Sequence, residues 1–211
     1  MIHIWGRLSS LNVRKVVWAA QELGVPFERT DAGRAFGVVH TPAYRSLNPN
    51  GVVPTLQDGA LVLWESNVIV RYLCAKYGAP TLAAPALYPQ DLAARFDAER
   101  WMDWQQTTLN RAGSPAFMQW FRTPAEQRDL AVIAQSVAAT EPLLQLLDTH
   151  LQGQAFMAGG AFTMADIPIA CEIHRWFGLP QAHPSLPHLE RWFAAILARP
   201  ATRGVLDLPL S

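Results

Sequence analysis

The sequence has few of the residues that mark disulfide-bonded or metal-binding proteins. Only two of its 211 residues are cysteines, Cys74 and Cys171. Neither belongs to a CxxC pair and both lie in apolar helical patterns, so we expect small buried hydrophobic residues and not a redox dithiol. The six histidines form no HExxH motif, and no metal site is predicted.

Charge of one sign and long apolar runs are also missing. Charged residues make up 16% of the chain, and 17 acidic residues balance 17 basic ones. A nucleic-acid or membrane-surface binder needs a basic excess, so neither partner is expected. No unbroken apolar run approaches the ~18 residues that span a bilayer. The opening MIHIWGRLSS lacks the basic segment and cleavage site of a signal peptide, so we expect a cytoplasmic protein.

Apolar residues make up half of the chain, and their spacing in the first part alternates between strand and helix patterns. Residues 1–5 and 27–31 are predicted strands, with a helix between them that ends at Gly24. After the loop-like residues 32–51, two apolar runs flank Asp58 and Gly59, the pair that a type I′ hairpin turn prefers. A helix follows at 65–78. This order predicts a mixed four-stranded sheet with helices packed on it.

The second part shows no convincing strand pattern. Residues 78–90 contain three prolines and little periodicity, which predicts a linker. Helices are predicted over 92–112, 123–151, 162–178 and 186–200. Thr123 with Glu126, and Thr163 with Asp166, fit the capping-box pattern, and we expect the second pair to be structural. The predicted division is an α/β domain at 1–79, a linker at 80–89 and an all-α domain at 90–211.

The stretch GRLSSLNVRK, residues 6–15, places two serines at the start of the first predicted helix. A hydroxyl at that position caps a helix. The same position also attracts anions, because free backbone N–H groups and the helix dipole meet there. From the residues alone, a cap and an anion site are both open.

Four motifs together resemble the bacterial cytosolic glutathione transferases of the serine type. They are GRLSSLNVRKVVWAAQELGVPFE, LNPNGVVPTL, LWESNVIVRYL and FTMADI, in this order. The resemblance covers nearly the whole chain. It implies a thioredoxin-like N-terminal domain, an all-α C-terminal domain and a homodimer. It also implies glutathione as a co-substrate, with no bound cofactor.

The resemblance also implies residues that hold the cysteinyl part and the glycyl end of glutathione. The bond before Pro54 is expected to be cis, with the backbone N–H and C=O of Val53 pairing with the cysteinyl part in strand fashion. Asn50 and Gly51 precede it, more as turn formers than as direct ligands. His40 is a candidate for the glycyl carboxylate, although a plain solvated histidine explains it equally well.

The pair Glu65 and Ser66 is expected to hold the γ-glutamyl end. Glu65 can accept from the ammonium group, and Ser66 with nearby N–H groups can bind the carboxylate. Simple capping of the following helix also explains Ser66, and the two roles are compatible.

The S-x-N pattern matches Ser10 and Asn12, so the resemblance assigns stabilisation of the glutathione thiolate to Ser10. Asn12 either supports Ser10 or contacts the sulfur directly, and Ser9 is the alternative hydroxyl donor. Serine cannot form the mixed disulfide that cysteine forms. The pattern therefore favours conjugation over thiol-transfer chemistry.

The aromatic stretch 101–121 lies where the family places its hydrophobic pocket for the second substrate. Trp104, Asn110, Arg111 and Phe117 are the candidates, although the aromatic residues also suit core or dimer contacts. Asp97, Arg100 and Asp103 remain open candidates for a dimer contact.

The leading hypothesis is a transferase that conjugates glutathione to a hydrophobic electrophile. A glutathione-dependent peroxidase or isomerase using the same site, or a non-enzymatic binding or scaffold protein, are the alternatives.

Overall fold

The computed structural model describes residues 1–78 and 86–210. Within the first range the main elements are β1 (Ile2–Trp5), α1 (Leu11–Glu22), β2 (Phe27–Thr30), β3 (Thr55–Asp58), β4 (Leu61–Trp64) and α3 (Ser66–Tyr77). The strands form one sheet in the order β2-β1-β3-β4. Strand β1 pairs parallel with β2 and antiparallel with β3. The predicted mixed four-stranded sheet of a thioredoxin-like domain is therefore confirmed.

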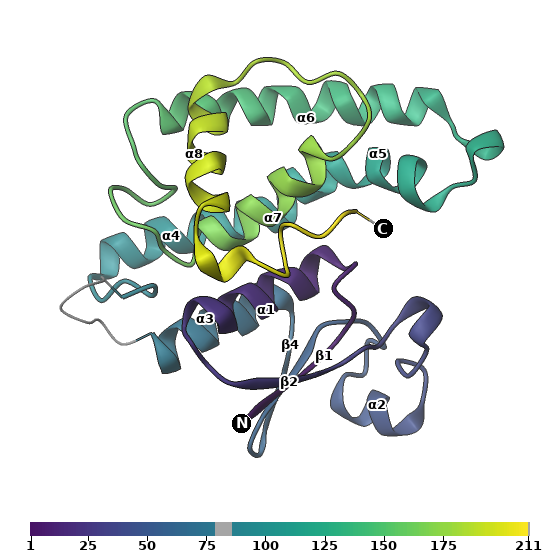
Figure 1. Cartoon of the computed structure of the whole chain (residues 1–211), viewed down its shortest axis with the longest axis vertical. Coiled ribbons are helices and arrows are strands. Elements are labelled where there is room, and N and C mark those ends of the chain that lie inside the picture. The colour runs from purple at the N-terminus through teal and green to yellow at the C-terminus, as the bar shows by residue number, and fades with distance from the viewer. Residues whose placement is uncertain (79–85, 211) are drawn as a thin grey trace.

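Helices α1 and α3 lie between this sheet and the helical second part of the chain (Figure 1). Burial alternates along β1, where Ile2 and Ile4 are almost fully buried. These side chains join Val16 of α1 and Ile69 of α3 in one hydrophobic cluster. The same cluster continues into the helices of the second part, so both parts share a core and α1 is buried from two sides.

The β3–β4 hairpin lies where it was predicted, but its turn is different. Asp58 pairs with Leu61, so the central turn residues are Gly59 and Ala60. Of these two only Gly59 has positive φ, at 60°, whereas a type I′ turn requires positive φ at both. Asp58 is the last strand residue, and its carboxylate accepts hydrogen bonds from side chains of α3.

Residues 32–51, predicted as a loop, contain two short helical segments. A 3-10 turn covers Arg34–Phe36 and helix α2 covers Pro42–Leu47. The Thr41 hydroxyl oxygen accepts from the Tyr44 backbone N–H at 3.2 Å, and Pro42 takes the first helical position. The Thr-Pro signal is visible in the sequence, but six residues show too little apolar periodicity to predict a helix.

Among residues 86–210 the long regular elements are all helices, as predicted. They are α4 (Leu92–Trp104), α5 (Asn110–Arg122), α6 (Leu130–Leu151), α7 (Asp166–Phe177) and α8 (Pro187–Leu197). Most of the predicted linker, at 80–85, lies outside the described residues, and 86–89 belong to no helix or strand.

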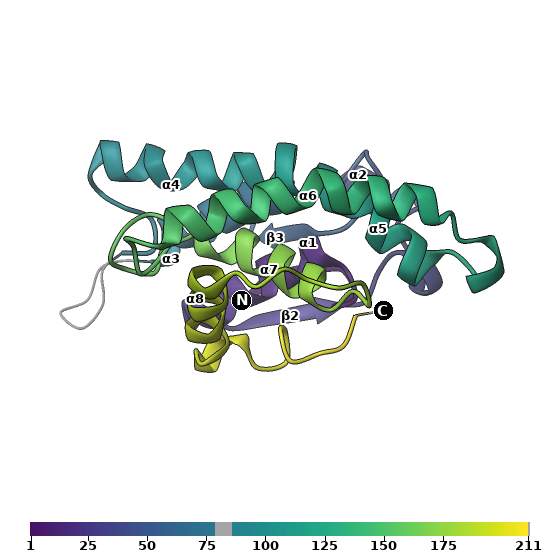
Figure 2. The same ribbon diagram turned by 90° about the horizontal axis from the view of Figure 1, so that it is seen from above.

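Helices α4 and α5 form one continuous run, joined by a π-helical turn at Gln105–Leu109. This helix was predicted to end at 112, and the residues just beyond that point include Gly113 and Pro115, which both disfavour helix. Helix α5 nevertheless continues to Arg122, because it packs along α6 (Figure 2). Tertiary contacts here override local propensity.

Of the two predicted capping boxes, one is wrong. Helix α6 begins at Leu130, not at 123, and Asp129 caps it by accepting from two backbone N–H groups. For the other capping box, Thr163 with Asp166, the hydrogen bond expected of the acidic residue is confirmed: Asp166 Oδ2 accepts from the Thr163 backbone N–H at 2.9 Å.

Helix α6 is long and apolar enough to cross a membrane by length and composition alone. Prediction from unbroken apolar runs missed this, because polar residues interrupt the helix without lowering its mean hydropathy much. In the structure α6 packs against α5 and α8 as part of the helical bundle. Cys74 and Cys171 are free and buried, as predicted.

Candidate active site

Two neighbouring clefts meet at the start of α1, the larger lined mainly by the first part of the chain and the smaller largely by α5 and α7. The larger cleft has a volume of about 660 Å³. Seven of the eight residues predicted for the glutathione side line it: Ser10, Asn12, His40, Val53, Pro54, Glu65 and Ser66. Asn50 does not line it. Its backbone N–H and side-chain amide both contact Asn48 Oδ1 at 3.1 Å, which makes it a turn former.

Ser10 is the N-cap residue of α1. Its backbone carbonyl accepts from the N–H groups of Val13 and Arg14 at 3.0 Å, but its side chain makes no cap hydrogen bond. The hydroxyl is therefore available at the helix N-terminus. Ser10 lines both clefts, whereas Ser9 lines only the smaller one.

The Asn12 side chain also lacks a protein partner. Its Oδ1 is buried, with no hydrogen bond to any described residue. Buried polar atoms are nearly always satisfied, so an unsatisfied one on a cleft wall suggests a ligand contact. No hydrogen bond joins Asn12 to Ser10 among the described residues, so direct contact with a ligand is favoured over support of Ser10.

The Val53–Pro54 bond is cis, as the resemblance implied. The backbone N–H and C=O of Val53 have no hydrogen-bond partner among the described residues. Gly51 shapes the loop before it with φ of 63°, and a Cβ there would lie only 3.1 Å from the Val39 carbonyl oxygen. A glycine is therefore required at this turn.

Glu65 and Ser66 stand at the start of α3. Glu65 has φ of 71°, a left-handed value that is uncommon for a residue other than glycine. Such strained backbone is concentrated at functional sites. The conformation leaves the Glu65 side chain exposed at the rim of the larger cleft, while Ser66 is buried beside it.

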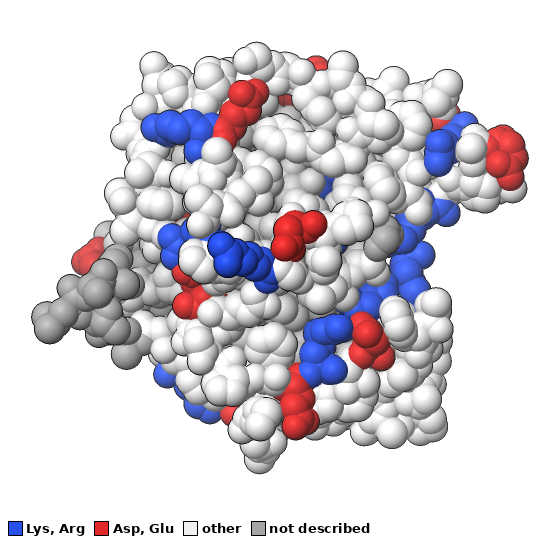
Figure 3. Space-filling view, viewed as in Figure 1, with Lys and Arg blue, Asp and Glu red and all other residues white. Residues whose placement is uncertain are grey.

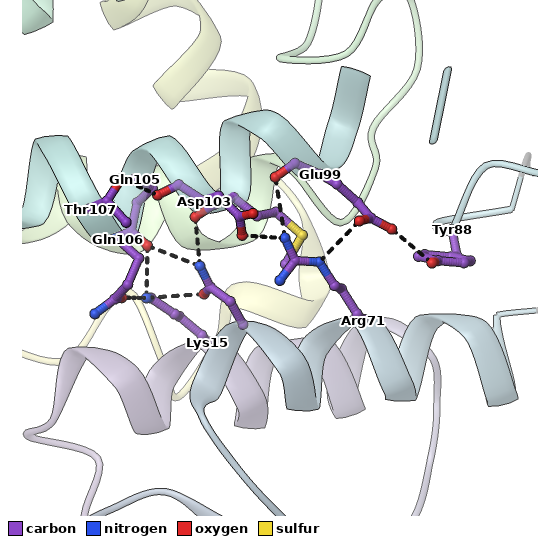
Figure 4. Close-up of polar contacts among 10 residues, drawn as sticks. Lys15, Arg71, Tyr88, Glu99, Asp103, Gln105, Gln106 and Thr107 are labelled. Atoms are coloured by element: carbon purple, nitrogen blue, oxygen red, sulfur yellow. Dashed lines mark hydrogen bonds and ion pairs between the residues drawn. The ribbon is translucent and has the colours of Figure 1, made fainter. Parts of the chain in front are cut away.

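Lys15, which the sequence analysis did not single out as a site residue, lies directly behind Ser66. Its side chain is fully buried. Its ammonium group donates to Gln105 Oε1 at 2.8 Å and to Gln106 Oε1 at 3.1 Å (Figure 4). It also contacts Asn67 Oδ1 at 3.2 Å and Ser66 Oγ at 3.5 Å. Burial lowers the pKa of Lys15 to about 8.

This polar network continues to the smaller cleft. Gln105 Nε2 donates to Glu172 Oε2 at 2.9 Å, and Glu172 forms a buried ion pair with Arg175. Arg175 in turn donates to Asn110 Oδ1 at 3.1 Å and to Ser114 Oγ at 3.2 Å. Side chains of α1, α3, the π-helical turn, α5 and α7 are thus linked. A sequence pattern cannot reveal this network, since its members meet only through tertiary packing.

The smaller cleft has a volume of about 240 Å³. Of the four predicted pocket residues, Asn110 and Phe117 line it, together with Ser114. These three are spaced i, i+4 and i+7 and share one face of α5. Arg111 is exposed on another face, and Trp104 packs edge-on against Trp101 with ring centroids 5.5 Å apart. Neither of these two lines either cleft.

The two clefts have a common wall, formed by Arg7, Ser10, Asn12 and Arg34. The sequence analysis predicted Ser10 and Asn12 as site residues but missed both arginines, because the family resemblance assigns a role to neither of them. Within the described residues, no group of three or more His, Cys, Asp or Glu side chains is placed to hold a metal ion.

Comparison with known proteins agrees with this architecture. Residues 9–76 match the family model of the glutathione S-transferase N-terminal domain, and residues 112–200 match that of the C-terminal domain. Glutathione S-transferase GstB of Escherichia coli K12 is 41% identical over the full length of both chains. Glutathione S-transferase 3 of Zea mays is 30% identical, over 99% of this chain and 95% of its own.

Among solved structures, the theta class glutathione S-transferase of Xanthomonas axonopodis pv. citri with glutathione bound superposes with a TM-score of 0.94. It is 48% identical, and the match covers 100% of this chain and 99% of that one. The two family models cover most of the chain, and full-length relatives share its fold and sequence. The chain belongs to the glutathione S-transferase family.

Proposed function

We propose that this transferase binds glutathione in the larger cleft, stabilises its thiolate through Ser10 and conjugates it to an electrophile in the smaller cleft. The observation that carries the proposal is the Ser10 side chain, which has no cap bond and stands on the common wall at the start of α1. A sulfur held at this wall is open to both clefts.

One hydroxyl is sufficient for this task. Lowering a thiol pKa from ~8.5 by ~2 units takes about 2.7 kcal/mol. One hydrogen bond to a charged group supplies ~1.5–3 kcal/mol, and a helix N-terminus adds ~0.3–1 kcal/mol. Ser10 therefore donates to the sulfur and does not itself attack. The thiol proton passes to solvent, and the thiolate then attacks the electrophilic carbon.

The unpartnered groups of the larger cleft suit the rest of glutathione. Val53 offers a free N–H and C=O for the cysteinyl part, the Asn12 amide nitrogen donates to the sulfur, and its Oδ1 accepts from an N–H of the peptide. Glu65 accepts from the ammonium, while Ser66 binds the γ-glutamyl carboxylate with the positive charge of Lys15 behind it. His40, exposed at the other side of the cleft, receives the glycyl carboxylate.

The first prediction tests Ser10. In a glutathione titration followed by thiolate absorbance, we expect the wild type to lower the pKa of the bound thiol. We expect Ser10→Ala to raise that pKa by about 1–2 units and to lower kcat/KM at neutral pH by about 10–100-fold. Ser9→Ala is the matched control and keeps the wild-type values.

An unchanged thiol pKa in Ser10→Ala would contradict this role, and a loss in Ser9→Ala would move it to the neighbouring serine. A wild type that binds no glutathione would favour the scaffold alternative. Peroxide consumption without conjugation would favour the peroxidase alternative.

We also propose that two copies pair through β4, α3 and α4. Large apolar side chains are exposed there, including Trp64, Val68 and Phe96. Arg71 of α3 holds this surface together by pairing with Glu99 and Asp103 of α4 (Figure 4). Exposed apolar patches of this kind are typical of interfaces. Asp97 and Arg100, the other candidates, pair with each other within the chain.

A further inference from the structure

The smaller cleft is lined by basic residues to a degree that a purely hydrophobic substrate does not explain. Five of its lining residues are arginines: Arg7, Arg14, Arg34, Arg122 and Arg175. No aspartate or glutamate of the described chain lines it. Basic side chains also gather on this face between the end of α5 and the lobe that carries α2 (Figure 3).

Two of these arginines have structural partners. Arg14 is 4% exposed and donates to the carbonyl oxygens of Leu8 at 2.7 Å and Pro209 at 2.8 Å, which ties α1 to the end of the chain. Arg175 is paired with Glu172. Their positions are explained without a ligand.

For Arg7 and Arg34, no ion pair within the described residues explains why their side chains line the cleft. Neither side chain takes part in an ion pair among the described residues. Arg7 Nε is buried without a hydrogen-bond partner in the described chain. Arg34 is exposed, has a left-handed φ of 51° and lines the common wall. Strained backbone and unsatisfied donors at one site both suggest a ligand.

These two positive charges converge with a third, on Arg122 at the end of α5. Burial and the charge of Arg34 lower the pKa of Arg7, and burial with the charges of Arg34 and Arg7 lowers that of Arg122. The three residues come from the loop after β1, the 3-10 turn and α5, so tertiary folding brings like charges together. An anion in the smaller cleft would relieve the repulsion between Arg7 and Arg34.

The cleft also offers an aromatic surface. The guanidinium carbons of Arg122 and Arg175 each lie 5.2 Å from the centroid of the Phe117 ring. Cations are attracted to the face of an aromatic ring. Phe117, which also stacks on Phe121, lines the cleft and so places apolar surface beside positive groups. A substrate that matches both has an apolar or aromatic body and an acidic group.

We propose that the electrophile of this enzyme is an organic anion, with a carboxylate, sulfonate or phosphate held by Arg7 and Arg34 while its apolar part contacts Phe117. The inference rests on the proposed conjugation reaction. In the reaction the thiolate sulfur forms a bond to the carbon that carries the leaving group. The carbon–halogen bond breaks, and halide departs with the bonding electrons. No redox partner is needed, and the acidic group takes no part in bond making.

The test compares a chlorodinitrobenzoate with its primary carboxamide, which has the same leaving group but no charge. At saturating glutathione, after correction for uncatalysed rates, we expect kcat/KM to favour the carboxylate by at least about ten-fold. Arg7→Gln and Arg34→Gln should each lower kcat/KM for the carboxylate by about ten-fold and leave the carboxamide nearly unchanged. Arg111→Gln, an exposed arginine outside both clefts, is the control.

Equal loss for both electrophiles, or a rise in the glutathione KM alone, would overturn the proposal and assign these arginines to glutathione. Calorimetric binding of unreactive dinitrobenzoate and dinitrobenzamide provides a readout that does not depend on conjugation. If neither electrophile is conjugated but the anion still binds more tightly through Arg34, the proposed conjugation fails, and with it the assignment of an electrophile, while the anion site in the smaller cleft is supported. If the two ligands bind equally, the inference fails whatever the conjugation assay shows.

Discussion

The ammonium group of Lys15 lies in the interior with no carboxylate in direct contact among the described residues. Amide oxygens of two glutamines and one asparagine, with one hydroxyl, replace its water shell. Such groups satisfy the three N–H donors but do not cancel the charge. Burial therefore dominates and lowers the pKa of Lys15 to about 8 from an ordinary value of 10.5.

This shift predicts how stability depends on pH. Below pH 8 Lys15 is charged in both the folded and the unfolded chain, so the folded state bears the full cost of burying the charge. Between about pH 8 and 10.5 the folded state loses the proton first, and the free energy of unfolding rises with pH. Urea denaturation at about pH 7 and about pH 9.5 should show a gain of about 2 kcal/mol for the wild type relative to Lys15→Met.

Lys76→Met is the matched control. Its ammonium is exposed and bonded to Asp58, which raises the pKa of Lys76 out of this range, so that variant should keep the wild-type slope. Parallel pH curves for the wild type and Lys15→Met would contradict the prediction.

At the scale of elements, caps and short connections position the helices around the clefts. Asp166 is the clearest case. Its carboxylate accepts from the backbone N–H groups of Met157 and Thr163 and from the indole N–H of Trp192, each at 2.9 Å. One fully buried side chain thus joins the start of α7 to α8 and to the loop that precedes α7.

We therefore expect Asp166→Ala to lower the free energy of unfolding by about 3–5 kcal/mol, because three buried donors lose their acceptor. Asp129→Ala removes an exposed cap of α6 and should cost only about 1 kcal/mol. Urea denaturation of both variants checks this. Similar losses in the two would show that the Asp166 contacts are no more than an ordinary cap, and a changed thiol pKa in folded Asp166→Ala would contradict a purely structural role.

The sequence predicted the types of the secondary-structure elements well. It predicted poorly where each element ends and which residues of a helix share a face. Apolar periodicity identified the strands and most helices, because burial imposes it directly. The π-helical turn at Gln105–Leu109 left no such signal, yet it changes which residues of the following helix share a face. Trp104 and Arg111 were predicted as pocket residues from their place in an aromatic stretch near a helix end, without any assignment of helix faces, and neither lines a cleft.

The same distinction holds within the site. Half of the residues that line the larger cleft were predicted as site residues, and all of these but His40 lie in the local motifs that carry the family resemblance. Arg34 and Gln106 lie far along the chain from the stretch 6–15, and they reach Arg7 and Lys15 only after folding. Nothing in the one-dimensional order indicates that a lysine on α1 and a glutamine some ninety residues later share a hydrogen bond.

For the whole molecule, the exposed apolar surface of β4, α3 and α4 predicts self-association. We expect the 23.4 kDa chain to sediment at about twice that mass, and Phe96→Glu to shift it toward the monomer, since burying an unpaired carboxylate is costly. Leu130→Glu, also at an exposed apolar residue but at the start of α6, should leave the dimer intact. A wild type that sediments as a monomer at micromolar concentration would rule this interface out.

The wall shared by the two clefts has one more consequence, for how a turnover ends. Under the proposed function, a conjugate is one molecule that occupies both clefts, so while one end stays bound the other is held next to its own cleft. For short tethers this corresponds to an effective concentration in the millimolar range. Under the proposed function, we therefore expect the product to dissociate only when both of its ends are released together, and product release, not bond formation, to limit kcat.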